Sequence, residues 1–123
     1  MAKRDGQIAF FANTRTGGYV LKTMAFPGHR VRTVKLSFRL PNACCASPAL
    51  TWAPTGRRLA IQTPGDHNAI WTINPDGSVA RRITPANGNF FNEVDWSPRG
   101  DFLTYTEGDF DHRRDPHAGI YKA

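Results

Sequence analysis

The sequence repeats one pattern at a fixed interval. The stretch WAPTGRRLAI at residues 52–61 returns as WSPRGDFLTY at residues 96–105, which is 44 residues later. Four residues recur at this spacing: Trp52, Pro54, Gly56 and Leu59 return as Trp96, Pro98, Gly100 and Leu103. A fainter copy, DGQIAF, lies at residues 5–10. Because equivalent residues at a fixed period have the same structural role, we expect a fold built from stacked, similar units.

Short β-strands fill these units. Residues 30–40, RVRTVKLSFRL, alternate apolar and polar side chains, which predicts a strand with one buried face and one solvated face. In the stretch NPDGS at residues 74–78, Asp76 and Gly77 indicate a tight turn between two strands. Other stretches rich in β-branched or aromatic residues are QIAFFA, YVLKTM, RRLAIQ, AIWTIN, ARRIT and DFLTYT. We therefore predict an all-β fold without a long helix.

A period in the forties with four short strands in each unit is typical of the blades of a β-propeller. We assign residues 1–46 to a partial blade with strands two to four, residues 47–90 to a full blade, and residues 91–123 to a partial blade with strands one to three. The chain would then hold about two and a half blades of four-stranded antiparallel meanders. Trp52 and Trp96 are expected to wedge between blades. The turns into the second strands are assigned to Pro54, Gly56, Pro98 and Gly100.

Several spaced motifs agree with one another along the chain. They are Trp-x-Pro-x-Gly, a short apolar strand, an Ile-Trp strand, Asn-x-Asp-Gly-Ser and Arg-Arg-Ile-Thr, and they are strongest at residues 47–107. This pattern resembles the repeats of the TolB-like β-propeller family, which also occur in the propeller domains of prolyl oligopeptidase-type peptidases. The resemblance covers almost the whole chain and implies an interaction module that binds a protein or peptide. An accessory propeller that gates a peptidase site elsewhere in a longer chain is the alternative.

The same resemblance implies a periplasmic location. The first residues, MAKRDGQIAFF, do not contain the apolar run of a signal peptide, so the location is left open. No run of apolar residues in the sequence reaches the roughly 18 that a membrane span needs. We therefore expect no membrane span.

Positive charge is concentrated in the first third of the chain. The formal net charge is +6, with +7 on residues 1–40 and −1 on the rest. A solvated outer strand whose Lys and Arg stems cover apolar surface explains this distribution best. Polyanion binding by this segment is a weaker alternative. Nucleic acid is not expected as a partner, because no aromatic stacking residues are interleaved with these charges.

Motifs for catalysis are absent from the sequence. None of Ser37, Ser47, Ser78 and Ser97 lies in a Gly-x-Ser-x-Gly elbow, and the sequence has neither a Gly-rich phosphate loop nor zinc-ligand spacing. We therefore expect that the protein is not an enzyme and uses no cofactor. The adjacent Cys44 and Cys45 are interpreted as thiols in or beside a core, since neighbouring thiols pair only under strain.

A charged segment interrupts the last unit. Residues 107–119, EGDFDHRRDPHAG, insert six residues relative to the preceding unit, which has TPGDHN at this place. Its Asp and His side chains are common metal ligands, but the two arginines in its centre oppose a cation, and we expect no metal. Loops that outgrow their repeat commonly carry recognition, so we expect a polar loop that contacts a partner. Its candidate contact residues are Asp109, Asp111, His112, Arg113, Arg114, Asp115 and His117.

The ten strands expected from this assignment are too few for a closed ring. A single-chain propeller has about four to eight blades of about four strands each. The blades at the two ends would therefore expose strand edges and apolar faces, which seek partners. Either the rest of a longer chain covers them or copies of this chain do. We expect a homo-oligomer, most simply a two-fold dimer whose two half-rings complete one propeller.

Overall fold

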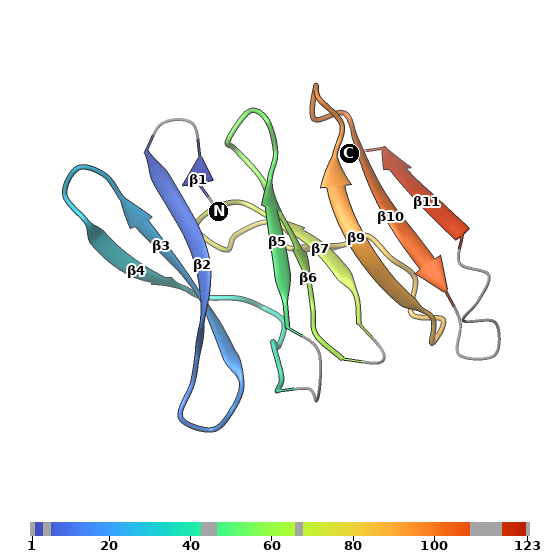
Figure 1. The fold of residues 1–123 in the computed structure, drawn as a ribbon, viewed down its shortest axis with the longest axis horizontal. Coiled ribbons are helices and arrows are strands. Elements are labelled where there is room, and N and C mark those ends of the chain that lie inside the picture. Colours follow the sequence, from blue (N-terminus) through green and yellow to red (C-terminus); the bar gives the residue numbers. More distant parts are fainter. Residues whose placement is uncertain (1, 4–5, 43–46, 66–67, 109–116, 123) are drawn as a thin grey trace.

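The computed structural model describes residues 2–3, 6–42, 47–65, 68–108 and 117–122. Within these residues, eleven strands form three antiparallel sheets that follow one another along the chain (Figure 1). The same residues contain no helix. The strands are β1 (Ala2–Lys3), β2 (Gln7–Asn13), β3 (Tyr19–Ala25), β4 (Arg30–Val34), β5 (Ala49–Trp52), β6 (Leu59–Gln62), β7 (Ile70–Ile73), β8 (Arg81–Arg82), β9 (Phe90–Trp96), β10 (Phe102–Gly108) and β11 (His117–Lys122). The predicted all-β fold is confirmed.

The first sheet has four strands in the order β1-β2-β3-β4. The sequence predicts three of them, and the structure adds β1, in which Ala2 pairs with Ile8 and Lys3 pairs with Gln7. This strand has two residues, which is too short for an alternation of apolar and polar side chains to reveal it. The first sheet is thus a four-stranded meander in the described part of the chain.

The strand predicted over residues 30–40 ends earlier than expected, because β4 stops at Val34. The chain then leaves the sheet and returns at Leu40, whose carbonyl accepts a hydrogen bond from the backbone N–H of Tyr19 at 3.0 Å. The predicted alternation persists as a pattern of burial. The buried or half-buried side chains are Val34, Leu36, Phe38 and Leu40, and the side chains between them are exposed.

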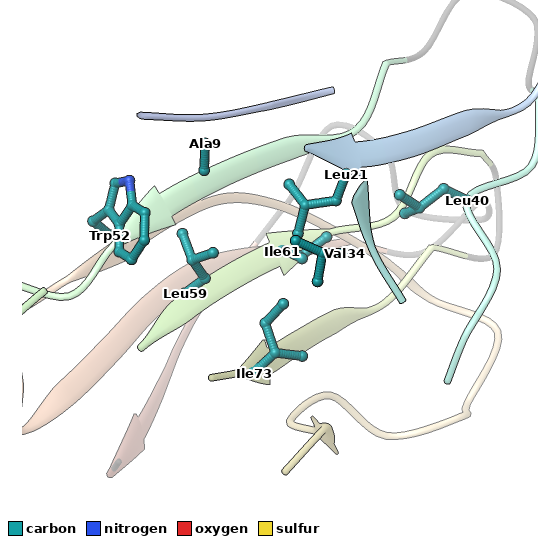
Figure 2. Packing of buried hydrophobic residues seen from close by; sticks show 8 residues of the cluster. All are labelled: Ala9, Leu21, Val34, Leu40, Trp52, Leu59, Ile61 and Ile73. Carbon is teal, nitrogen blue, oxygen red and sulfur yellow. The ribbon is translucent and has the colours of Figure 1, made fainter. Parts of the chain in front are cut away.

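The hydrophobic core lies between the first and second sheets (Figure 2). Its buried members are Ala9, Leu21, Val34, Leu40, Trp52, Leu59, Ile61 and Ile73. Phe38, from the segment that follows β4, stacks on Trp71 of β7 with ring centroids 4.5 Å apart. Such a stack adds to the free energy gained from burying apolar surface. The excursion of the chain after β4 therefore covers the second sheet, which is the physical reason why β4 ends where it does.

The second sheet has the order β5-β6-β7-β8 and contains two turns that depend on glycine. Gly56 closes the turn before β6 with φ 72, and Gly77 closes the turn between β7 and β8 with φ 88. These left-handed conformations are costly for residues with a Cβ. A Cβ at Gly77 would also meet the carbonyl oxygen of Lys35. The turn at residues 74–78 thus packs directly on the chain that leaves the first sheet.

The third sheet has the order β9-β10-β11 and contacts β5 and β6 through β9. Polar groups attach it to the second sheet. The Oδ1 atom of Asn68 accepts a hydrogen bond from the N–H of Phe91 at 2.7 Å, and its Nδ2 atom donates to the carbonyl of the same residue. The indole N–H of Trp96 donates to the carbonyl of Thr51 in β5 at 3.1 Å. Side-chain hydrogen bonds therefore join these two sheets beside the apolar contacts.

Candidate functional site

A cleft of about 310 Å³ lies between the second sheet, where the β5–β6 turn, β7 and β8 line it, and the end of β9 with the turn that follows it in the third sheet. Its charged groups are the guanidinium groups of Arg58 and Arg81, and among the described residues no acidic side chain lines it. The hydroxyl-bearing residues Thr55 and Thr72 also line it, and Trp96 of the third sheet forms part of its wall. We call this feature the arginine cleft.

Arg58 is held in place from within the second sheet. Its Nη1 atom donates a hydrogen bond to Oδ1 of Asn74 at 3.0 Å. Its Nη2 atom donates to Oγ1 of Thr72 at 2.8 Å and to the carbonyl of Val79 at 3.4 Å. Arg58 immediately precedes β6, and the pairing of β6 with β7 brings it opposite the end of β7. Its guanidinium therefore has a fixed orientation at the cleft.

Arg81 lines the same cleft from β8, where it pairs with Thr72 across the β7–β8 register. Burial lowers the pKa of Arg58, and the positive charge of Arg81 lowers this pKa further. Two like charges without an acidic neighbour on the cleft surface create a positive potential that favours an anion. Arg82, the next residue, does not line the cleft, and its Nε atom donates to the carbonyl of Thr84 at 2.9 Å.

A larger and more open hollow of about 500 Å³ lies beside the β2–β3 hairpin and the segment that follows β4. Apolar parts of Tyr19, Leu36 and Phe38 form much of its wall, and these side chains pack on the hydrophobic core. Among the described residues, Arg39 is its single charged lining residue. This hollow therefore lacks the paired positive charges that characterise the arginine cleft.

The two ends of the stack present sheet faces that no other described sheet covers (Figure 1). Since successive side chains of a strand point to opposite faces, the residues between those of the core lie on the outward face of the first sheet. This face is mainly apolar and partly exposed, and it contains Ile8, Phe10, Val20, Lys22 and Met24. On the third sheet, Phe102 is 41% exposed and Ile120 is 72% exposed.

The segment that the sequence predicts as a contact loop lies mostly outside the described residues. This applies to Asp109, Asp111, His112, Arg113, Arg114 and Asp115, and to Cys44 and Cys45. His117 is the first residue of β11, where its backbone pairs with Glu107. The contact role of this segment stays a prediction.

The repeated Trp and Gly residues occupy equivalent places in the second and third sheets. Trp52 ends β5 and Trp96 ends β9, and each is the last residue of the first strand of its sheet. Trp52 lies in the core between the first and second sheets. Gly56 and Gly100 have φ angles of 72 and 79, and the N–H of each closes a turn at 2.8 Å.

The remaining repeat residues lie in exposed turns. Pro54 and Pro98 are exposed and stand two residues before the turn glycines. Asp76 accepts hydrogen bonds from the hydroxyl and the N–H of Ser78, and these two bonds lower the pKa of Asp76. Next to Asp76, the N–H of Gly77 donates to the carbonyl of Asn74 at 2.9 Å. The Asp side chain thus stabilises the turn between β7 and β8.

The described part of the chain contains no group of three or more His, Cys, Asp or Glu side chains placed to hold a metal ion. It contains no helix of the length and apolar character needed to cross a bilayer.

The arrangement of the sheets is shared with a solved structure. The crystal structure of TolB from Acinetobacter baumannii matches 95% of this chain with a TM-score of 0.71 and 13% sequence identity. This chain has a TolB-like fold. It spans 27% of the length of that TolB chain. No protein-family model matches the sequence, and no curated protein matches it.

At 13% identity this likeness shows the fold alone. It confirms the predicted fold class, an all-β partial propeller, and it confirms the resemblance to TolB-like repeats as a likeness of fold. We therefore refer to the three sheets as the blades of a TolB-like segment. A binding partner does not follow from the fold, so its chemistry has to be argued from the residues of the segment.

The arginine cleft is not predicted by the sequence analysis. Arg81 and Arg82 belong to the Arg-Arg-Ile-Thr motif of the repeat, and no motif singles out Arg58. One available signal is the alternation of side chains along β8, which places Arg81 and Arg82 on opposite faces of the sheet. The turn at residues 74–78 then sets the register that brings Arg81 level with Thr72.

Proposed function

We propose that this TolB-like segment is a non-catalytic interaction module that binds a protein or peptide partner, and that further blades complete its ring. The fold supports this proposal, because a propeller uses its sheet faces to cover neighbouring blades and leaves recognition to loops and clefts. The arginine cleft opens between two blades and is the described feature best suited to a charged partner.

The main support for a completed ring comes from the outward face of the first sheet. In the second sheet, Leu59, Ile61 and Ile73 face the first sheet and are fully buried against it. Ile8 pairs with Met24 in the first sheet as Leu59 pairs with Ile73 in the second. The outward face of the first sheet is therefore equivalent to the face with which the second sheet packs on the first. No other sheet in the described part of the chain covers this face.

A second copy of the chain is the occupant that the charges favour. Residues 1–40 carry a net charge of +7, whereas residues 90–122 hold four basic and seven acidic residues and carry −3. The first sheet of one copy is therefore attracted to the third sheet of another. In a two-fold arrangement both ends of each copy are covered at once, which is the usual outcome for closed homo-oligomers.

Further blades within a longer polypeptide are the alternative, since the chain spans 27% of the TolB chain that it matches. In that case the segment is one part of a single-chain ring, and a gating propeller of a prolyl oligopeptidase-like peptidase belongs to this class. A catalytic domain encoded downstream of residue 123 would favour it.

Light scattering coupled to size-exclusion chromatography tests the completed ring. We expect a mass of twice 13.7 kDa at tens of micromolar chain. Phe10→Glu on the first sheet and Phe102→Glu on the third sheet each place a charge on an end face, so each is expected to return the mass to that of one chain. Val79→Glu is the matched control, because Val79 is 65% exposed in the turn between β7 and β8 of the middle sheet, which presents neither end face.

The opposite result is equally clear. A mass of one chain at every concentration, together with a melting temperature independent of concentration, would show that the end faces do not need a second copy. A dimer whose mass responds to Val79→Glu and not to Phe10→Glu would place the contact elsewhere. Either result would remove the second copy as the occupant of these faces.

A further inference from the structure

The arginine cleft has hydrogen-bond donors in excess of its acceptors. A guanidinium group has five N–H donors, and Arg58 directs three hydrogen bonds to acceptors of its own sheet. In the described part of the chain, the side chain of Arg81 has no hydrogen-bond or ion-pair partner. Arg81 lines the cleft and is exposed. Its planar donor fork is therefore available to a ligand at a place where Arg58 is already fixed.

The rest of the cleft wall is amphipathic. Val79 and Ile83 line it on the side of the second sheet, and Trp96 lines it on the side of the third sheet. The indole ring of Trp96 is held by its N–H bond to the carbonyl of Thr51, so its position is set by the contact between the blades. A ligand that fills this volume is therefore expected to have an apolar part next to an anionic group.

The size of the cleft limits the ligand further. Its volume of about 310 Å³ stands at the lower end of small-ligand pockets, which are about 300 to 1,000 Å³. A cleft of this size accepts one or two amino-acid residues. A planar carboxylate matches the fork of an arginine through two parallel hydrogen bonds. An inorganic phosphate matches the charge but leaves the apolar wall uncovered.

We propose that the arginine cleft binds the carboxylate end of a peptide whose last residue has an apolar side chain. The terminal carboxylate pairs with Arg81 and with the remaining donors of Arg58, and the last side chain packs on Val79, Ile83 and Trp96. This inference rests on the proposed peptide-binding function, for which it names the chemistry of the partner. It is independent of whether a second copy or a longer chain completes the ring.

The test uses the whole chain and the probe N-acetyl-glycyl-glycyl-leucine with a free carboxylate. Binding is followed by amide shifts of the residues that line the cleft, and by tryptophan fluorescence, to which Trp96 in the cleft wall contributes beside Trp52 and Trp71. We expect saturable binding that weakens with added salt, because the contact is an ion pair at a partly exposed site. The same peptide with an amidated end is expected to bind at least about tenfold more weakly, since it has lost the charge that pairs with the arginines.

Two variants with the same change of charge separate this site from a general attraction. Arg81→Gln is expected to weaken binding at least about tenfold. Arg82→Gln is the matched control, because Arg82 is adjacent in β8 but does not line the cleft, and it is expected to leave binding unchanged. Both arginines are exposed and lie outside the core. The melting temperatures of the two variants are therefore expected to differ only by the small amount that is typical of substitutions at exposed positions.

Four outcomes would overturn the inference. Equal binding of the acid and the amide would show that no carboxylate is recognised, and equal loss in Arg81→Gln and Arg82→Gln would show attraction to net charge alone. Tighter binding of inorganic phosphate, or of an amidated peptide with an internal glutamate, would assign the cleft to a different anion. The absence of any binding would also overturn it, while the mass in solution would still report separately on the completed ring.

Discussion

Asn68 offers the sharpest test of how the third blade is attached. Its side chain is 4% exposed and bonds to both backbone groups of Phe91, which has no exposed surface. One amide side chain therefore completes the hydrogen bonding of a residue that begins the contact of β9 with the second sheet. We expect Asn68→Ala to destabilise the fold much more than the removal of a typical surface amide.

The magnitude follows from the two groups that would lose their partner. Leaving a buried N–H or C=O without a hydrogen bond costs about 1 to 3 kcal/mol each. Both groups of Phe91 are affected, so the expected loss is about 2 to 6 kcal/mol, with the lower half applying if water enters the space. Such a loss is a large share of the roughly 5 to 15 kcal/mol that stabilises a domain.

Equilibrium unfolding in urea measures this free energy. The matched control is Asn87→Ala, because Asn87 is exposed and its Nδ2 atom donates to Glu107 at 3.2 Å. We expect a change of about 0.5 kcal/mol or less for Asn87→Ala. Asn68→Asp should cost at least as much as Asn68→Ala at neutral pH, since a buried carboxylate can accept from the N–H of Phe91 but is poorly solvated and repels the carbonyl of Phe91. If Asn68→Ala and Asn87→Ala cost the same, the polar attachment of the third blade is refuted.

Three further perturbations have defined outcomes. Val79→Gly should raise the free energy of unfolding by about 1 kcal/mol in thermal denaturation, because Val79 has φ 53 and a side chain that is 65% exposed. Gly108→Ala should lower it by about 1 to 3 kcal/mol, because the added Cβ would meet the ring of Phe90. Ser78→Ala should raise the pKa of Asp76 in an NMR titration, since the hydroxyl bond that favours the carboxylate is lost.

The sign of the Asp76 effect follows from linkage. Hydrogen bonds from Ser78 lower the pKa of Asp76 in the folded chain, so the stabilisation is present above the ordinary pKa of an aspartate. It is lost as the pH falls through the lowered pKa of the folded chain. The difference in the free energy of unfolding between the wild type and Ser78→Ala should therefore become smaller in acid. A difference that stays constant down to low pH would contradict this account.

The sequence predicts well what depends on periodicity. The repeat at residues 52–61 and 96–105 predicts the successive sheets, and the alternation over residues 30–40 predicts which side chains are buried. It does not predict where β4 ends, because the same side chains stay buried after the chain has left the strand. The end of β4 is set by Phe38, which stacks on Trp71 of another blade. A contact between blades is invisible to the local pattern.

The arginine cleft escapes the sequence for the same reason. Arg58 and Arg81 come from different strands of the second sheet, and Trp96 comes from the third. A count of charges finds the excess of positive charge in residues 1–40, whereas the cleft uses two arginines from the part of the chain that is nearly neutral. The decisive feature is the absence of acidic residues from the lining of the cleft in the described structure, which is a property of space and not of composition.

The two contacts between the blades differ in a way that bears on binding. The first and second blades share the large apolar core, including Trp52 (Figure 2). The third blade reaches the second through β9 on β5 and β6, and residues of β7 and β8 line the arginine cleft together with Trp96 at the end of β9. A ligand in this cleft contacts Arg58 on one side and Trp96 on the other, so it adds to the attachment of the third blade. Because such coupling is reciprocal, Asn68→Ala, which loosens this attachment, is expected to weaken ligand binding as well.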